Sequence, residues 1–562
     1  MVFHSQFNPV EVPNTDLVTL VFDAIDKVEY WKDINRPVSI DAETGKSITV
    51  GEFKQQVIEV AAGWQRKAGL KRGQVVAIIS PNDIHYSTAI FGTLAAGGVV
   101  TPMNPAYTTS EVVHQLKDSG AQFAIVDPLL WDTLRPAFKQ VGIPTSRVYT
   151  FPTANPSLSN PPRIPGSPSD LFTLRHPGPW QPVHFTAQEL ATTPAFLCYS
   201  SGTTGRSKGV ITTHRNMVAN VMQIHSYRQQ GNEQAEGWII AGVLPFYHIY
   251  GLNVLMHLPI IEGGSVVIVR KFDLLKFLSH IEKYRIDFAY LVPPIILGLT
   301  KHPAADKYDL SSLKGIISGA APLPPALSEA VYKKLHFRVR QGFGMTETSA
   351  VSHLTSATST DTEGVGVLLP LQEAKIIDED GKELGVNQPG ELCLRGPNIT
   401  LGYLNNPEAN RNAFLPDGFM RTGDVVYADE NGTFYMYDRI KELIKYKGFQ
   451  VAPAELEALL LSHPKVDDVV VVGAYDEEQV TEVPRAYVVL RGQRVPDDLK
   501  EYQATAKELS DFVNEKVASH KKLRGGVEFI KEVPKSPSGK TLRRIMREQA
   551  RQSPTKPLAA KL

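Results

Sequence analysis

The chain has 562 residues, of which 42% are hydrophobic, so it is long enough to bury several packed cores. Its 59 lysine and arginine residues equal its 59 aspartate and glutamate residues, and this zero net charge argues against nucleic acid as the main partner. Any affinity for phosphate must come from a local group of charges. The two cysteines, Cys198 and Cys393, each lie in an apolar run, and we expect both to be buried in the core rather than joined in a disulfide.

Three segments bear on the compartment in which the chain acts. Residues 1–16 lack a basic region followed by an apolar one, so we expect no secretory signal. The apolar stretch 238–261 is interrupted by prolines and histidines, which predicts a buried strand and a site loop and no integral membrane segment. The last residues, Ala560, Lys561 and Leu562, resemble the Ser-Lys-Leu type of peroxisomal address. We therefore expect recognition by a peroxisomal import receptor, the alternative being a cytoplasmic protein with an ordinary tail.

Short apolar runs alternate with amphipathic segments along the first half of the chain. Residues 53–68 have the pattern of a helix, whereas residues 75–80, 123–127 and 265–270 are short runs rich in branched apolar side chains. Such runs are typical of strands buried on both faces, so the alternation predicts an α/β fold with largely parallel strands. Residues 151–182 are rich in proline and serine without periodicity, and we expect a surface excursion between two subdomains.

The pattern changes near Asp438, where a lysine-rich hairpin begins. Beyond it the sequence predicts a helix, two strands and another helix, at residues 453–463, 466–473, 486–490 and 508–518. A helix-on-sheet unit of this size predicts a separate small domain. We therefore divide the chain into a large domain, residues 1–437, and a small domain, residues 438–562.

The final segment, residues 531–562, is basic. It holds nine lysine and arginine residues against two glutamates. Such a segment is either a solvated tail or a lobe that meets phosphates, and composition alone favours the solvated tail.

The run from Tyr199 to Gly209 reads YSSGTTGRSKG and follows a short apolar strand. Its glycines let backbone N–H groups approach an oxyanion, its hydroxyls add donors and Lys208 supplies a point charge. It is not a Walker A loop, because Ser207 precedes Lys208 and Gly209 follows it. By itself, a run of this composition is more often an ordinary flexible loop.

Eight segments in order resemble the adenylate-forming superfamily, which includes acyl-CoA synthetases, 4-coumarate:CoA ligases, firefly luciferases and nonribosomal adenylation domains. They are SSGTTGRSKG at residue 200, LPFYHIY at 244, SGAAPL at 318, QGFGMTE at 341, PGELCLRG at 389, RTGD at 421, DRIKELIKYKG at 438 and PSGK at 537. They span nearly the whole chain and are most similar to the 4-coumarate:CoA ligase-like branch. The resemblance implies the adenylate-forming enzyme fold, in which a large N-terminal domain of α/β subdomains carries a small, mobile α+β C-terminal domain.

The resemblance implies an ATP-dependent carboxylic acid:CoA ligase that works through an acyl-adenylate, with ATP, Mg²⁺ and coenzyme A as its cofactors and co-substrates. A carboxylate oxygen attacks the α-phosphorus of ATP and pyrophosphate leaves, so the protein must neutralise charge and align the reactants. We assign Glu347 to Mg²⁺, because a hard cation prefers oxygen ligands, and Thr346 to the α-phosphate. From the dipeptide alone, a helix cap would be the better interpretation. Asp424 is assigned to the ribose hydroxyls, with assistance from Arg439.

The family pattern assigns further residues by segment. His248 would orient the substrate carboxylate, although a lone histidine in an apolar stretch is more often a core residue. The remaining nucleotide-binding assignments are Ser200, Ser201, Gly202, Thr203, Thr204, Gly205, Lys208, Gly319, Ala320, Ala321, Gln341, Gly342, Phe343 and Gly344. The assignments to the acid pocket are Tyr250, Ile317, Met345, Ala350 and Val351.

Two groups of lysines divide the reaction into halves. Lys540 resembles the family lysine that reaches the ATP and carboxylate oxygens during adenylation. Lys445 and Gly448 resemble the face that enters for thiol transfer, and Lys441 lies at the hinge position about which the small domain turns. Without the family, the lysines of this hairpin would be read as a charged strand edge.

The acid pocket departs from that of plant hydroxycinnamate ligases. Those enzymes commonly carry a lysine where this chain has Ile317, and Gly-Pro-Val where this chain has residues 349–351, Ser-Ala-Val. An apolar wall favours a hydrophobic aryl or medium-chain acid. Ser207 stands where the family usually has proline, which leaves the phosphate loop less stiff.

Three alternatives to the acid:CoA ligase remain open at this point. The acyl group of the adenylate could pass to a carrier protein, or a luciferase-like enzyme could oxidise the adenylate. A non-catalytic nucleotide-binding protein is the more distant alternative, and the intact Lys208, Glu347, Asp424, Arg439 and Lys540 argue against it. The separate substrates of the ligase would be a small carboxylic acid, ATP and CoA.

Overall fold

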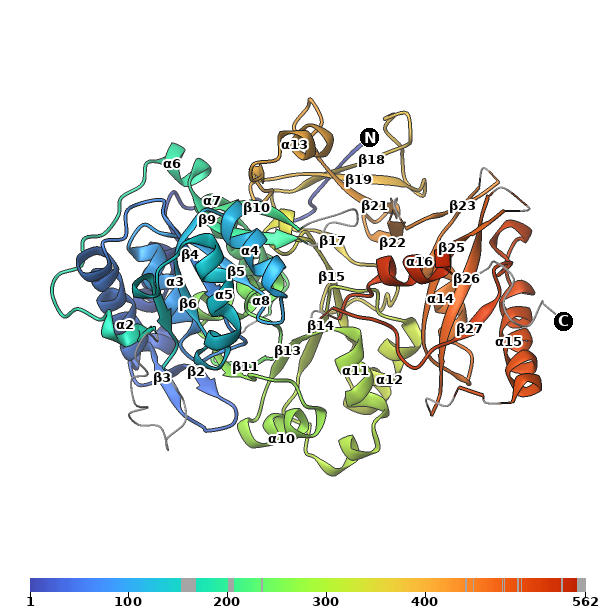
Figure 1. The fold of residues 1–562 in the computed structure, drawn as a ribbon, viewed down its shortest axis with the longest axis horizontal. Coiled ribbons are helices and arrows are strands. Elements are labelled where there is room, and N and C mark those ends of the chain that lie inside the picture. The colour runs from blue at the N-terminus through green and yellow to red at the C-terminus, as the bar shows by residue number, and fades with distance from the viewer. Residues whose placement is uncertain are drawn as a thin grey trace.

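The computed structural model describes residues 1–152, 168–200, 207–233, 236–439, 442–447, 449–477, 479, 481–492, 495–496, 498–536 and 539–552. Figure 1 shows a large domain and, beside it, a smaller body coloured orange to red that contains the C-terminal elements. The mixed α/β architecture with a small C-terminal domain is the one that the sequence predicts.

Two large sheets form most of the large domain. The first has eight strands in the order β20 (Gly402–Tyr403), β10 (Lys208–Thr213), β9 (Pro194–Ser200), β5 (Val99–Met103), β4 (Val75–Ile79), β6 (Ala121–Val126), β7 (Val148–Thr150) and β8 (Ser169–Asp170). The second has nine strands in the order β17 (Val367–Leu368), β16 (His353–Leu354), β15 (Arg340–Phe343), β14 (Gly315–Ser318), β13 (Phe288–Leu291), β11 (Ile239–Gly242), β12 (Ser265–Ile268), β2 (Pro37–Asp41) and β3 (Ser47–Thr49). Their central strands pair in parallel, which confirms the sequence prediction.

The main hydrophobic core lies between these two sheets and joins apolar side chains from both of them. Helix α3 (Tyr86–Ala95) is buried along its whole length, because small and apolar residues cover every side of it. The other helices of the large domain are α1 (Leu17–Lys27), α2 (Val50–Gly63), α4 (Thr109–Asp118), α5 (Trp131–Val141), α6 (Ala187–Thr192), α7 (His214–Gln230), α8 (Ile249–Met256), α9 (Leu258–Glu262), α10 (Leu274–Tyr284), α11 (Pro293–Lys301), α12 (Pro325–Leu335) and α13 (Pro407–Ala413).

A third, antiparallel sheet completes the large domain and leads to the small one. Its order is β1 (Val2–His4), β18 (Glu373–Ile377), β19 (Gly390–Arg395), β21 (Met420–Ala428) and β22 (Phe434–Arg439). The small domain contains the hairpin of β23 (Ile444–Tyr446) and β24 (Phe449–Val451) and a sheet of β25 (Val466–Asp476), β26 (Thr481–Leu490) and β27 (Val527–Phe529). It has its own core beneath α14 (Pro453–Leu461), α15 (Leu499–Asn514) and α16 (Arg543–Gln552).

Several local predictions differ from the structure. Helix α15 begins at Leu499, nine residues before the predicted start, because Asp498 caps it by accepting from two backbone N–H groups of the first turn. After β11, residues 243–248 form the predicted loop, but the rest of the stretch to residue 261 forms α8 and most of α9. The predicted surface excursion is wrong for residues 168–174, since β8 joins the first sheet and Leu171 and Leu174 are buried, whereas residues 175–182 form an irregular segment at the surface.

The basic C-terminal segment also differs from the tail favoured by composition. Residues 543–552 form helix α16, which buries Met546 and Ala550 and packs against β25. Figure 1 shows α16 on the side of the small domain that faces the large domain. The tail residues Ala560, Lys561 and Leu562 lie outside the described residues.

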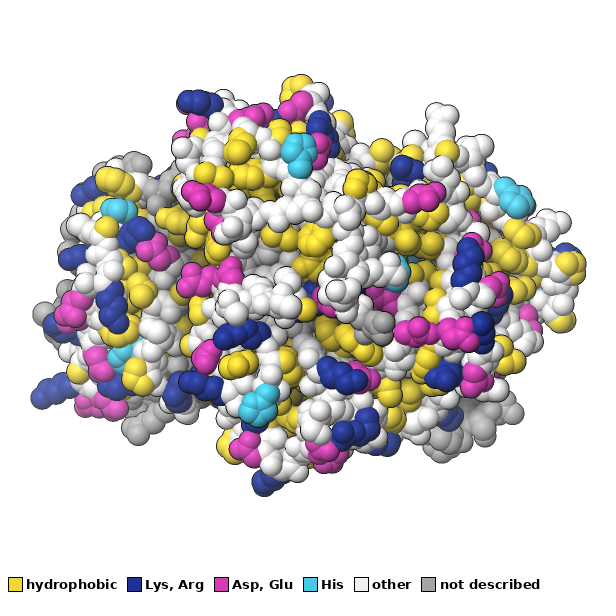
Figure 2. All heavy atoms as spheres, turned by 180° about the vertical axis from the view of Figure 1, so that it is seen from behind, with side chains coloured by type: hydrophobic (Ala, Val, Ile, Leu, Met, Phe, Trp, Pro, Cys, Tyr) yellow, Lys and Arg dark blue, Asp and Glu magenta, His cyan; other side chains and the backbone are white. Residues whose placement is uncertain are grey.

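Surface charge and burial agree with the composition. On the face drawn in Figure 2, side chains of both signs are interspersed with apolar ones. Cys198 and Cys393 are both free thiols and both buried, as expected. No helix among the described residues is long and apolar enough to cross a membrane.

Candidate active site

A cavity of about 2400 Å³ lies between the large and small domains. Residues from β9, β10, α4, the loop before α8, β21, β22 and the segment around α16 line it. Ten lysines and arginines contribute to the lining against six aspartates and glutamates, and six of the ten cations come from residues 535–551. Although the chain has no net charge, lysines and arginines therefore outnumber aspartates and glutamates at this cavity.

The two described ends of the phosphate-loop segment line the cavity, where two antiparallel strands lie side by side. Strand β9 ends at Ser200 and β10 begins at Lys208, and both residues line the cavity. His114 Nε2 donates to the carbonyl of Ser207 at 3.0 Å, and Lys208 Nζ lies 5.0 Å from the ring centre of Tyr403. The predicted ligands Ser201, Gly202, Thr203, Thr204 and Gly205 lie outside the described residues.

Glu347 sits in a short 3₁₀ turn just after β15, and its side chain is almost fully buried. Its Oε1 accepts hydrogen bonds from Ser200 Oγ at 3.2 Å and from the Tyr403 hydroxyl at 2.9 Å. Neither donor is a cation, so these two contacts do not neutralise the carboxylate. The neighbouring Thr346 lines the cavity, as Glu347 does.

Tyr403 is a site residue that sequence reasoning missed. A single Gly-Tyr pair carries no motif, and only the antiparallel pairing of Val210 with Tyr403 brings β20 beside the phosphate segment. Burial and the adjacent Glu347 raise the pKa of Tyr403, so its hydroxyl stays protonated and remains a donor.

The metal assignment fits the donors that are present. The described residues hold no group of three or more His, Cys, Asp or Glu side chains placed to bind a metal. A Mg²⁺ at this position would have Glu347 as its protein ligand and take its other ligands from phosphate and water, which is the usual arrangement for this ion.

Asp424 and Arg439 face each other across β21 and β22, where the two residues are register partners. Arg439 Nε lies 2.9 Å from Asp424 Oδ1, and Asp424 is only 1% exposed. Burial raises the pKa of Asp424, whereas Arg439 and then Lys540 oppose that rise. Among the described residues nothing donates to Asp424 Oδ2, and this oxygen is buried. Asp424 does not itself line the cavity, whereas its neighbour Gly423 and its ion-pair partner Arg439 do.

His248 caps the N-terminus of α8. Its Nδ1 accepts from the backbone N–H of Tyr250 at 3.3 Å. Burial, with a smaller effect from Lys540, lowers the pKa of His248 to about 4, so the ring is neutral at pH 7 and carries its proton on Nε2. His248 therefore offers one N–H donor to the cavity that it lines.

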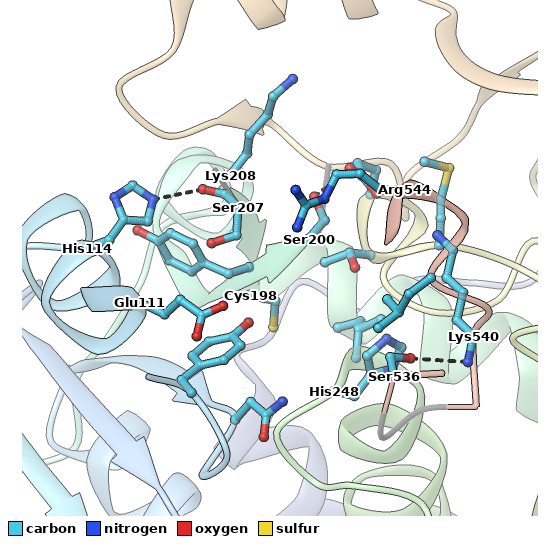
Figure 3. Close-up of a pocket in the computed structure, with 18 of the residues that line it drawn as sticks. Glu111, His114, Cys198, Ser200, Ser207, Lys208, His248, Ser536, Lys540 and Arg544 are labelled. Atoms are coloured by element: carbon cyan, nitrogen blue, oxygen red, sulfur yellow. Dashed lines mark hydrogen bonds between the residues drawn. The ribbon is translucent and has the colours of Figure 1, made fainter. Parts of the chain in front are cut away.

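Lys540 is carried into the cavity by a tight turn of the small domain. The backbone N–H of Gly539 donates to Ser536 O at 2.8 Å, and that of Lys540 donates to Ser536 Oγ at 3.1 Å. Figure 3 shows this turn beside His248. Burial, followed by repulsion from Arg439, lowers the pKa of Lys540 to about 8, so the ammonium form still predominates at pH 7.

Lys445 lies elsewhere on the small domain. It is on the exposed side of β23, where its backbone N–H donates to Glu482 Oε2 at 2.9 Å, and it does not line the cavity. The structure therefore brings Lys540, and not Lys445, to the other site residues. The hinge assignment Lys441 and the assignment Gly448 lie outside the described residues.

The predicted wall residues divide into two layers. Ala320, Gly344 and Met345 line the cavity itself. Gly344 tolerates no side chain, because an added Cβ would lie 1.7 Å from the carbonyl oxygen of Ala350. The cavity wall at this point therefore consists of closely packed backbone.

The second layer lies behind that wall and does not line the cavity. Ile317 and Ala350 are buried in the main core, and Tyr250 and Val351 pack against it. The Tyr250 ring also limits Gly319, where an added Cβ would lie 3.0 Å from the ring.

The other members of this layer support the backbone. Gln341 donates through Nε2 to the carbonyl of Thr362 at 3.0 Å, and Phe343 packs edge-to-face on His353. Gly342 pairs with Leu354 between β15 and β16, and Ala321 is partly buried. These residues therefore hold the backbone of the cavity wall in position.

Comparison with known proteins agrees with this geometry. The chain matches the AMP-binding enzyme family over residues 29–404 and the AMP-binding enzyme C-terminal domain over residues 455–540. A probable 4-coumarate–CoA ligase 1 of Dictyostelium discoideum is 36% identical over 517 residues, which are 91% of each chain. Phenylacetyl-CoA ligase epaB of Aspergillus niger is 37% identical over 550 residues, which are 96% of this chain and 98% of that protein.

A solved structure of similar fold carries ATP. ATP-bound MatB from Rhodopseudomonas palustris superposes with a TM-score of 0.82 at 26% identity, covering 95% of this chain and 99% of that one. Its apo form gives a TM-score of 0.73 over the same coverage. The chain as a whole is therefore more similar to the ATP-bound form.

Proposed function

The chain belongs to the family of AMP-binding enzymes, and on that premise we propose that it is an ATP-dependent carboxylic acid:CoA ligase acting in two steps through an acyl-adenylate. The observation that carries the proposal is the arrangement of Glu347, Asp424 and Lys540 at one cavity, which Glu347 and Lys540 line and which Asp424 adjoins through Gly423 and Arg439. These three side chains come from three distant segments, and their chemistry suits phosphate-bound metal, ribose and developing phosphate charge respectively.

In the first step, a carboxylate oxygen of the acid forms a bond to the α-phosphorus of ATP as the bond to pyrophosphate breaks. Lys540, as an ammonium ion, would neutralise the charge that develops on the phosphate oxygens, and the Nε2–H of His248 would orient the attacking carboxylate. Arg439 holds Asp424 in place to accept from the ribose. Mg²⁺, held by Glu347, would supply charge to the phosphates.

In the second step, the CoA thiol attacks the acyl carbon and AMP leaves. Lys445 is outside the cavity here, so we propose that the small domain turns near Lys441 to exchange the Lys540 face for the Lys445 face. The arrangement described here is the one suited to the first step.

For the acid, we propose a hydrophobic aryl or medium-chain acid. Support comes from relatives named for coumarate and phenylacetate, and from the apolar layer around Ile317 and Ala350 that backs the cavity wall. The test supplies short, medium and long fatty acids and benzoic, phenylacetic and cinnamic acids with ATP and Mg²⁺, and measures pyrophosphate with and without CoA. CoA-dependent turnover that yields a thioester supports the proposal. Adenylate accumulation indifferent to CoA would favour a carrier-protein loader or an adenylate oxygenase.

For the compartment, we propose import into peroxisomes through Ala560, Lys561 and Leu562. The full chain fused behind a fluorescent protein should colocalise with a peroxisomal marker, whereas a chain with Leu562→Asp should remain diffuse. Equal distribution of the two fusions would contradict the proposal.

A further inference from the structure

Half of the ten cations that line the cavity are paired with carboxylates: Arg421 with Glu391, Arg439 with Asp424, Lys535 with Asp468, Arg543 with Glu442 and Glu457, and Arg544 with Glu548. Within the described ranges, the other five have no carboxylate partner: Lys117, Lys208, Lys540, Arg547 and Arg551. Lys208 and Lys540 already have roles in adenylation. The remaining three are cations that the mechanism does not yet use.

These three side chains come from both domains. Lys117 is an exposed residue in the last turn of α4, in the large domain, whereas Arg547 and Arg551 lie on α16 of the small domain. Any anion that they share would bridge the two domains.

Helix α16 is built to present its arginines to the cavity. Met546 and Ala550 are buried in the small-domain core, and Arg543 is fixed by Glu442 at 2.6 Å and Glu457 at 2.5 Å. The spacing of Arg544, Arg547 and Arg551 places them along one face of the helix, and all three line the cavity. The helix is thus anchored on one side and basic on the adjacent side.

The basic face lies on the side of the cavity where the phosphates are expected. Figure 3 shows Arg544 reaching into the cavity beside Ser200, on the same side as Lys208, with His248 on the other side. In an in-line displacement, the leaving group departs opposite the attacking carboxylate, which we place near His248. Pyrophosphate would therefore leave toward α16.

We propose that Arg547 and Arg551, with Lys117 and Arg544, bind the pyrophosphate product in the outer cavity and hold the small domain in this position until pyrophosphate leaves. The inference rests on the proposed function, because that reaction supplies the pyrophosphate. Arginine binds phosphate oxygens in a bidentate manner, and pyrophosphate offers oxygens to both domains at once. The 3′,5′-bisphosphate of CoA has related chemistry, so the test must separate the two anions.

The test titrates inorganic pyrophosphate with Mg²⁺ into the full-length protein saturated with AMP, by calorimetry. Three variants are compared with the wild type. They are the double variant Arg547→Ala and Arg551→Ala, the single variant Lys117→Ala, and the control Arg491→Ala. Arg491 is exposed at the end of β26 and does not line the cavity. Loss of charge-assisted contacts should weaken pyrophosphate binding by about tenfold or more in the double variant and by about threefold in Lys117→Ala. The control should match the wild type.

A second titration with adenosine 3′,5′-bisphosphate identifies the anion, and melting temperatures confirm that each variant folds. A double variant with lysine at both positions keeps the charge and should recover part of the affinity. The inference is overturned if the wild type does not bind pyrophosphate, if the alanine variant binds it equally well, if Arg491→Ala weakens it to the same extent, or if only the bisphosphate is affected. Because this binding needs neither acid nor CoA, a failure of the ligase proposal would appear as missing thioester with the pyrophosphate result unchanged.

Discussion

Gly539 of the small domain packs against Val292 of the large domain, and a Cβ added to Gly539 would lie 3.1 Å from Val292 Cγ2. Gly539 also has a φ of +77°, a conformation that strains any other residue. Lys540 follows directly, so this contact sets how far the lysine reaches into the cavity.

Gly539→Ala should therefore slow adenylate formation, by about tenfold, because the turn must shift away from Val292 and strain of roughly 1–2 kcal/mol is added. Thioester formation from supplied acyl-adenylate should change little. Gly492→Ala is the matched control, since Gly492 has a φ of +83° but no atom within 4 Å of an added Cβ. Equal loss of adenylation in both variants would show that backbone strain, and not the contact, is responsible.

The two lysines should separate the half-reactions. Lys540→Ala should reduce adenylate formation by about 10²–10³-fold, because it removes a charge placed to stabilise the transition state. Lys445→Ala should leave that half intact and slow thioester formation from supplied acyl-adenylate. Single-turnover measurements of each half check this, and a loss in the same half for both variants would refute the assignment of two faces.

Adenylation should also depend on pH through Lys540. Its pKa is lowered to about 8, so the ammonium ion is lost as the pH rises through 8 and the rate should fall along that limb. Because the pKa of His248 is about 4, no titration of this ring should appear near pH 6.5. Single-turnover rates from pH 6 to 10 test both statements. In Lys540→Arg the guanidinium keeps its proton, so the remaining rate should no longer fall as the pH rises through 8.

Asp424→Asn should raise the KM for ATP by about tenfold or more, since it leaves Arg439 without its ion pair and weakens the acceptor for ribose. Initial rates at varied ATP concentrations measure this. Asp380→Asn is the control. Asp380 lies in an exposed turn, so this variant should have the same KM for ATP as the wild type. A KM that is unchanged in Asp424→Asn would remove Asp424 from the nucleotide site.

The sequence predicts well what depends on local pattern. The apolar runs at β4, β6 and β12 and the motif residues Asp424 and Lys540 carry their own signals, through burial periodicity or family resemblance. Asp424 and Arg439 are fifteen positions apart in the sequence, and only the register of β21 and β22 shows that they pair.

Features that depend on tertiary contact escape sequence reasoning. Tyr403 reaches Glu347 only because β20 adds to β10, and the arginines of α16 meet the cavity only because the adjacent, apolar side of the helix packs on β25. Composition suggested a solvated tail for residues 531–562 because it does not record which neighbour buries Met546 and Ala550. In the same way, the polar composition around Leu171 conceals the core that buries it.

The most direct test of the central claim follows the oxygen of the acid. The acid with the highest turnover in the panel is labelled with ¹⁸O in its carboxylate and converted with ATP, Mg²⁺ and CoA. The account predicts one ¹⁸O in AMP, none in pyrophosphate, and an equal amount of acyl-CoA. Label in inorganic phosphate, or AMP without ¹⁸O, would contradict an acyl-adenylate and with it the roles given to Glu347, Asp424 and Lys540.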